Sequence, residues 1–105
     1  MTHFYNTTHL QASALTEAIE KAKNQEDIIL ILYRHYKKLS PGQVLNILQA
    51  KHRITWPLTS IRRAIFNLTD RGALEKTPTM REGIYGSEEH IWKILAAGEQ
   101  LSMGL

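Results

Sequence analysis

The apolar positions of residues 57–72 follow the spacing of a helix with one buried face. Ile61, Ile65 and Leu68 recur at i, i+4 and i+7, which is a single amphipathic stripe. Pro57 suits the first turn, because its φ is fixed and its missing N–H is not needed there. Gly72 suits the residue that follows the last turn. The pattern therefore predicts a helix from residue 57 to about residue 71.

Polar side chains that can contact DNA bases or phosphates occupy much of the opposite face of this predicted helix. On a wheel of about 100° per residue, Phe66 and Asp70 lie on the same outer half and suit DNA less well. A large apolar group there is typical of a position covered by another element or a partner, and an acid would repel phosphate. A solvated surface helix is the alternative interpretation. The polar candidates are Thr59, Ser60, Arg62, Arg63 and Asn67.

Two further helices are predicted before residue 40. Residues 8–23, with Thr8 as N-cap, carry an alanine-rich stripe that includes Leu15 and Ile19. That stripe can face either the domain's own core or a second copy of the chain. Residues 24–39 are capped at Asn24 and apolar on nearly every side near their start, which predicts a central helix continuing through Leu39.

The remaining segments predict one short helix, one extended segment, a hairpin and a C-terminal tail. Ser40-Pro41 predicts a short helix to about residue 51, with Gln43 completing a capping box. Residues 53–56 suit a brief extended segment. Residues 74–77 and 90–94 alternate between polar and apolar positions, which predicts a hairpin around a polar loop of about twelve residues. Residues 96–105 give no clear signal and are expected to fray.

Composition limits the class of protein. The chain has 105 residues, 43% of them hydrophobic and 22% charged, which is typical of one globular domain rather than disorder. The absence of cysteine excludes disulfides and thiol catalysis. No apolar run approaches the roughly 20 residues of a membrane span, and the N-terminus lacks the features of a secretory signal. We expect a soluble, cytoplasmic protein.

Positive charge is concentrated on the segment that holds the helix of residues 57–71. Residues 1–39 carry five Lys or Arg and four Asp or Glu, a net +1. Residues 40–81 carry seven and two, a net +5, and residues 82–105 carry one and four, a net −3. This distribution supports a phosphate-binding surface on the middle segment.

The predicted order of elements and one string of residues resemble the winged helix–turn–helix family. The resemblance covers residues 24–95 and implies a mainly α fold with a small β-hairpin, preceded by an arm and an extra N-terminal helix (1–23) and followed by a tail (96–105). Three segments, YNTT, AKNQEDIIL and WPLTSIRRAIFNLT, are also similar to small bacterial and prophage winged-helix proteins. The string consists of Ser60, Ile61, Arg63, Ile65, Leu68, Gly72 and Leu74.

The resemblance implies binding to double-stranded DNA by a small transcriptional regulator or a prophage-type accessory factor. The helix of residues 57–71 would enter the major groove through Thr59, Ser60, Arg62, Arg63 and Asn67, with Arg63 as the leading candidate. The hairpin of residues 74–95 would act as a wing through Lys76, Arg81 and Tyr85.

The sequence also allows two kinds of protein–protein contact. Leu15, Ile19 and Phe66 are candidates for a dimer or partner surface. The alternative function is a winged-helix adaptor that binds another protein and not DNA.

No catalytic or metal-binding constellation is present in the sequence. The five histidines have no spacing typical of metal ligands, and no glycine-rich loop suited to phosphate precedes a helix. We therefore expect no enzyme activity, no cofactor and no small-molecule ligand.

Overall fold

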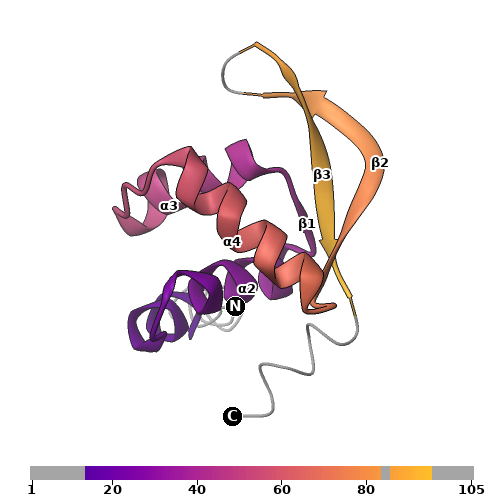
Figure 1. Ribbon diagram of the computed structural model, residues 1–105. Helices are drawn as coiled ribbons and strands as arrows, with labels where there is room; N and C mark the ends of the chain where they lie inside the picture. Colours follow the sequence, from indigo (N-terminus) through magenta and orange to yellow (C-terminus); the bar gives the residue numbers. More distant parts are fainter. Residues whose placement is uncertain (1–13, 84–85, 96–105) are drawn as a thin grey trace, which may run out of the picture.

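The computed structural model describes residues 14–83 and 86–95 of the chain (Figure 1). The predicted extended arm, the N-cap at Thr8, the wing residue Tyr85 and the tail of residues 96–105 lie outside these ranges. The described part of the N-terminal helix covers residues 14–21.

Helices precede a β-hairpin along the chain, as the sequence predicts. The hairpin projects from the helices, and α4 lies between α2 and α3 on one side and the sheet on the other (Figure 1). The bounds are α2 Gln25–Tyr36, β1 Lys38–Leu39, α3 Pro41–His52, α4 Leu58–Asp70, β2 Leu74–Glu82 and β3 Glu88–Ile94.

The start of α3 has the predicted capping box. The Ser40 hydroxyl oxygen accepts a hydrogen bond from the Gln43 backbone N–H at 3.2 Å. The Gln43 side-chain oxygen accepts one from the Ser40 N–H at 2.9 Å. Two backbone donors that a helix start leaves unpaired are thereby satisfied, and Pro41 takes the first helical position. The sequence signal is confirmed.

The buried stripe of α4 is also confirmed. Ile61, Ala64, Ile65 and Leu68 are at most 3% exposed. The helix begins at Leu58, one residue later than predicted, because Pro57 is extended and serves as the N-cap. Gly72 follows the helix at φ +82°, a left-handed conformation that glycine adopts without strain.

The short strand lies at a different place from the one predicted. Residues 53–57 form no strand, and Arg53 ends α3 in the left-handed region. The strand is instead β1, whose residues Lys38 and Leu39 pair with β3. Lys37 has φ 75° and terminates α2, so the helix does not continue through Leu39 as the apolar pattern suggested.

The hairpin strands are longer than their alternation predicted. They pair antiparallel from Leu74 opposite Ile94 to Glu82 opposite Glu88, with an irregularity between Lys76 and Met80. The strand order is β1-β3-β2. The strands leave only residues 83–87 between them, in place of the predicted loop of about twelve residues.

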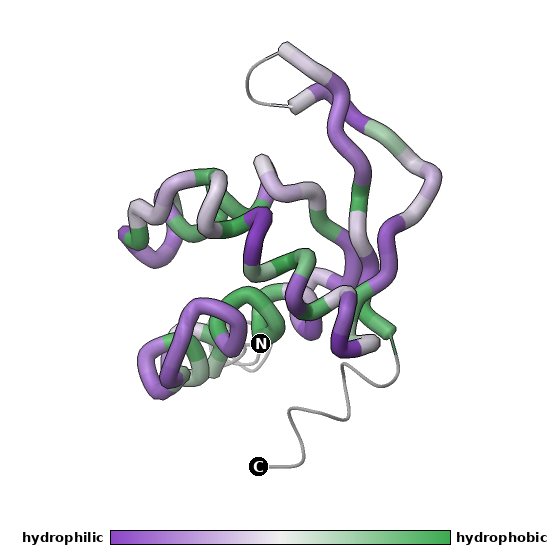
Figure 2. Tube along the Cα trace, viewed as in Figure 1, coloured by the Kyte–Doolittle hydropathy of each residue, from purple (hydrophilic) through white to green (hydrophobic). Residues whose placement is uncertain are grey.

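The hydrophobic core lies where the helices meet the base of the sheet, and the hydrophobic stretches of the tube gather there (Figure 2). Ile19 of the N-terminal helix is 5% exposed and belongs to this core. The alanine-rich stripe therefore places Ile19 against the chain's own interior. Other members are Ile29, Leu32, Tyr33, Val44, Leu48, Ile61, Leu68, Leu74 and Trp92.

A buried tyrosine connects α2 to β1 inside this core. The Tyr33 hydroxyl donates a hydrogen bond to the Leu39 carbonyl at 2.8 Å. Burial raises the pKa of this hydroxyl well above its usual value, and the Glu89 carboxylate adds to the effect. The hydroxyl therefore stays protonated and acts as a permanent donor that holds β1 beside the end of α2.

Candidate nucleic-acid interface

The first half of the outer face of α4 presents two unpaired arginines. Thr59, Arg62 and Arg63 are exposed, and Ser60 is half-buried. Among the described residues, neither Arg62 nor Arg63 forms an ion pair. The opposite side of the same turns is fully buried, so the backbone beneath these side chains is held firmly in place. The result is a cationic surface on a rigid support.

The second half of the outer face is occupied by a carboxylate from another helix. The Asn67 side-chain N–H donates to one Glu26 carboxylate oxygen at 2.9 Å, and the Arg71 guanidinium contacts the other at 2.6 Å. Glu26 lies in the first turn of α2, which packs against α4. The structure thus holds Asn67, a predicted DNA contact, in a hydrogen bond within the protein.

A hollow of about 430 Å³ lies between the first turn of α2 and the outer face of α4. Ser60, Arg63 and Asn67 line its α4 side, and the first turn of α2 lines the other. Arg63 and Ser60 therefore lie on the α2 flank of the outer face, where Glu26 is the nearest acidic element of the lining.

A cleft of about 260 Å³ lies on the other flank, between α4 and the hairpin. Arg62, Ile65 and Phe66 of α4 line one side, and Glu88, Glu89, His90 and Trp92 of β3 line the other, with Pro41 at the start of α3. The Phe66 ring meets Trp92 edge-to-face at 6.3 Å between centroids. Phe66 nevertheless remains 59% exposed. The hairpin therefore supports this side chain without covering it.

The predicted wing cations lie on β2 and are exposed. The Lys76 ammonium is 5.9 Å from the centre of the Trp92 ring, and Arg81 Nε donates to the Glu82 carbonyl at 3.3 Å. Glu82 and Glu88 pair across the end of the ribbon. Lys76 therefore lies near the base of the wing, whereas Arg81 lies among acids at the distal end, opposite Glu89.

Glu89 has a structural role that the sequence did not reveal. Its carboxylate accepts a hydrogen bond from the Ser40 hydroxyl at 2.6 Å and from the Gly42 N–H at 3.2 Å. A negative group at a helix N-terminus is favourable, because the unpaired N–H groups there carry partial positive charge. Glu89 therefore attaches the wing to the start of α3. No local signal indicates this, since the partners are 47 and 49 residues away.

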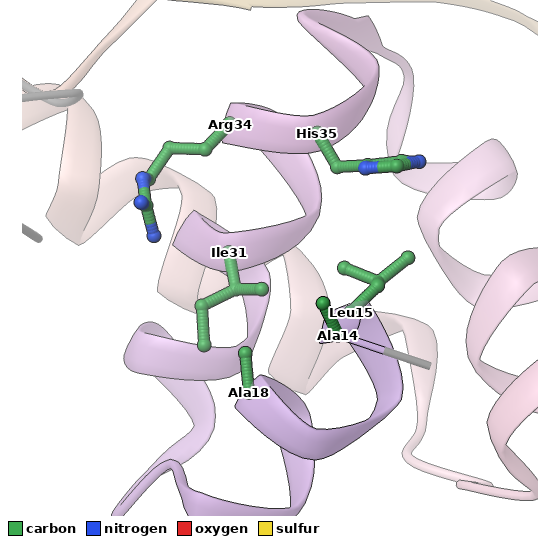
Figure 3. A pocket seen from close by; sticks show the side chains of 6 residues that line it. All are labelled: Ala14, Leu15, Ala18, Ile31, Arg34 and His35. Atoms are coloured by element: carbon green, nitrogen blue, oxygen red, sulfur yellow. The ribbon is translucent and has the colours of Figure 1, made fainter. Parts of the chain in front are cut away.

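The N-terminal helix and α2 enclose another hollow, of about 430 Å³. Ala14, Leu15 and Ala18 line it from the first helix, and Ile31, Arg34 and His35 from α2 (Figure 3). Leu15 is half-buried and packs on the core. Of the predicted partner residues, Leu15 and Phe66 retain exposed surface, whereas Ile19 does not.

No group of three or more His, Asp or Glu is arranged to hold a metal ion in residues 14–83 and 86–95. No helix in that part of the chain is long and apolar enough to cross a membrane.

A solved structure has a similar arrangement. The chain aligns with a crystal structure of a mutant of MarR from E. coli at a TM-score of 0.61, with 13% sequence identity, over 99% of this chain and 71% of that one. The chain has the winged helix–turn–helix fold. At this identity the likeness shows the fold alone. No family model matches the sequence, and no curated protein matches it.

The winged-helix fold assigns a place to each element. In it, α3 and α4 form the helix–turn–helix, and β2 with β3 forms the wing (Figure 1). The exposed arginines lie on α4, which lines the cleft together with β3, and the exposed cations of the wing lie on the neighbouring strand β2. The predicted site is thus an exposed, cationic surface rather than an enclosed pocket.

Proposed function

We propose that this winged helix binds double-stranded DNA, with α4 in the major groove and the wing against the neighbouring backbone. The observation that carries the proposal is the pair of exposed guanidinium groups, Arg62 and Arg63, on the outer face of a helix whose inner face is buried. Neither forms an ion pair with a described residue. A helix of this shape fits the major groove, and arginine binds guanine or phosphate there. The role is that of a small transcriptional regulator or a prophage-type accessory factor.

The side chains divide into base contacts and phosphate contacts. Arg63 and Arg62 have the donors to bind guanine O6 and N7. Thr59 and Ser60 hydroxyls suit phosphate at the helix start. Asn67 can read adenine only after releasing Glu26, so its contribution is expected to be smaller than the sequence suggested.

The wing contributes through two cations, one near its base and one near its distal end. Lys76 and Arg81 are exposed and suit phosphate, and Tyr85 is a further predicted contact outside the described residues. The acidic pair at the distal end, Glu82 and Glu88, would be repelled by the duplex. We therefore expect Lys76 to be the stronger wing contact with the backbone, because neighbouring acids weaken the attraction of Arg81 for phosphate.

Retention of the full chain on a column of random duplex DNA tests the proposal. Binding should weaken steeply as salt rises, because arginine and lysine displace condensed counterions from phosphate. Selection of bound duplexes from a random pool would then identify a preferred sequence. Absence of retention at low salt would contradict DNA binding.

The exposed apolar side chains favour a second candidate, a protein-binding adaptor. Phe66 is 59% exposed and Met80 on the wing is 41% exposed. An adaptor would leave the DNA column in the void volume and would show no salt-dependent retention. The same experiment therefore separates the two functions.

We further propose that the protein acts as a homodimer. Many helix–turn–helix proteins recognise two half-sites one helical turn apart as dimers. Leu15 is the predicted partner residue of the N-terminal helix that keeps some exposed surface. Light scattering at high micromolar concentration tests this, and a monomeric mass there would contradict it.

A further inference from the structure

Phe66 is a large apolar side chain on the face that carries the free arginines. It lies three residues after Arg63 and four after Arg62, so the three side chains are neighbours on the helix surface. A single exposed apolar residue needs no explanation. Phe66 differs because its ring is held edge-to-face against the buried Trp92. It is therefore both exposed and fixed in position.

The charges around Phe66 indicate what can cover it. A protein that packed on this ring would also have to cover Arg62 and Arg63, and burying unpaired guanidinium groups is costly. The Lys76 ammonium lies beside the Trp92 ring on the neighbouring strand. Two carboxylates, Glu88 and Glu89, also line the cleft, and that of Glu89 is already bonded to the start of α3. Duplex DNA pairs arginine and lysine cations with phosphates and guanine acceptors. In the same groove it presents one apolar group, the 5-methyl of thymine.

The size of the cleft beside Phe66 agrees with a small occupant. Its volume is about 260 Å³, below the range of roughly 300–1,000 Å³ that is typical of pockets for whole ligands. A single group presented by a larger molecule fits this space better than a separate small molecule does. The methyl edge of one base pair is such a group.

We propose that Phe66, positioned by Trp92, contacts the 5-methyl group of a thymine and gives the protein a thymine preference next to its arginine contacts. The inference rests on the proposed DNA binding and adds a specificity-determining residue to it. Phe66 then acts within the interface, and it is not the surface for a dimer partner.

Thymine-to-deoxyuridine exchange in a bound duplex tests the inference, because it removes the methyl group and nothing else. Each thymine of a selected duplex would be exchanged in turn, and affinity measured by fluorescence anisotropy. At one or two positions the wild-type protein should lose about fourfold in affinity, the equivalent of one apolar carbon buried. The Phe66→Ala protein should bind the original duplex more weakly and show no response at those positions.

Met80→Ala is the matched control, because Met80 is also a large, exposed apolar residue but lies on the wing. It should keep the response to the lost methyl group. An unchanged response in Phe66→Ala, or no response of the wild type at any position, would overturn the inference while leaving DNA binding intact. A selected site without thymine would overturn it in the same way. Failure to select any duplex would overturn the proposed function and the inference together.

Discussion

The two halves of the outer face of α4 differ in whether their polar groups already have partners. In the first half, Arg62 and Arg63 are exposed and form no ion pair with a described residue. In the second half, Asn67 and Arg71 share the carboxylate of Glu26. The helical wheel set Phe66 and Asp70 apart, but it did not show that Asn67 and Arg71 have a partner on another helix.

The difference arises because α2 supplies partners to only one half of this surface. The first turn of α2 packs beside the C-terminal half of α4 and brings a carboxylate there. Glu26 neutralises one cation and occupies one amide, whereas the N-terminal half stays positive. The surface offered to DNA is therefore shorter than the polar face of the helix, and variants at its two ends should behave differently.

Removing both free arginines should have the largest effect on DNA binding. Arg62→Ala with Arg63→Ala is expected to cost at least about 1–3 kcal/mol of binding free energy, the range for one arginine that reads guanine. Base preference should relax at the same positions. Fluorescence anisotropy with a selected duplex measures both effects, and unchanged affinity would contradict the assignment of α4.

Removing the Glu26 charge should make the second half of the outer face of α4 attract DNA as the first half does. Glu26→Gln keeps the shape of the side chain but removes its charge, so the Arg71 cation becomes available to phosphate. We expect tighter binding, and a plot of log affinity against log salt that is steeper by about 0.9 for one new phosphate contact. An identical slope would show that Arg71 does not reach DNA.

Arg71→Ala removes an arginine from the second half of the outer face of α4, and is compared with the variants at Arg62 and Arg63. Because Glu26 already pairs with this guanidinium, its loss should change DNA affinity much less than the loss of Arg62 and Arg63. Its effect should appear in the free energy of unfolding, as a decrease of about 0.2–1 kcal/mol, typical of a partly exposed ion pair. Urea denaturation measures it, and a loss of DNA affinity equal to that of the double variant would contradict the comparison.

The smallest expected effect is at Asp70, an exposed acid at the end of α4. An acid in the last turn opposes the partial negative charge of the helix C-terminus, so Asp70→Asn should stabilise the fold by about 0.3–1 kcal/mol at low salt. It should also raise DNA affinity slightly, because it removes a repulsive charge. A decrease in thermal stability would mean that Asp70 has a favourable contact.

Local signals predicted the parts of the fold that depend on neighbouring residues. The stripe from Ile61 to Leu68 spans about two helical turns and the box from Ser40 to Gln43 about one, so their spacing alone identifies them. The short strand lies at β1 and not at residues 53–56, because its formation depends on a distant part of the chain. A two-residue strand exists only because Lys38 and Leu39 meet β3, and no pattern of two residues indicates a strand.

The sequence predicted which polar side chains would lie on the outer face of α4. It did not predict which of them already have a partner within the protein. Arg62 and Arg63 are exposed, as their wheel positions implied. The partner of Asn67 lies 41 residues away and that of Arg71 lies 45 residues away. The hydrogen bonds of Glu89 to Ser40 and Gly42 span even longer separations. Such contacts follow from the packing of α2, α3 and the wing, which sequence periodicity does not contain.

The contact between Glu89 and the start of α3 has a consequence for the thermodynamics of binding. Because the wing is attached to α3 at Ser40 and Gly42, the spacing between wing and α4 is set when the chain folds. A partner that enters this space therefore finds it preorganised, and little conformational entropy remains to be lost on association. The same rigidity gives the proposed interface a fixed width, so it would favour B-form duplex over the narrow, deep major groove of A-form RNA.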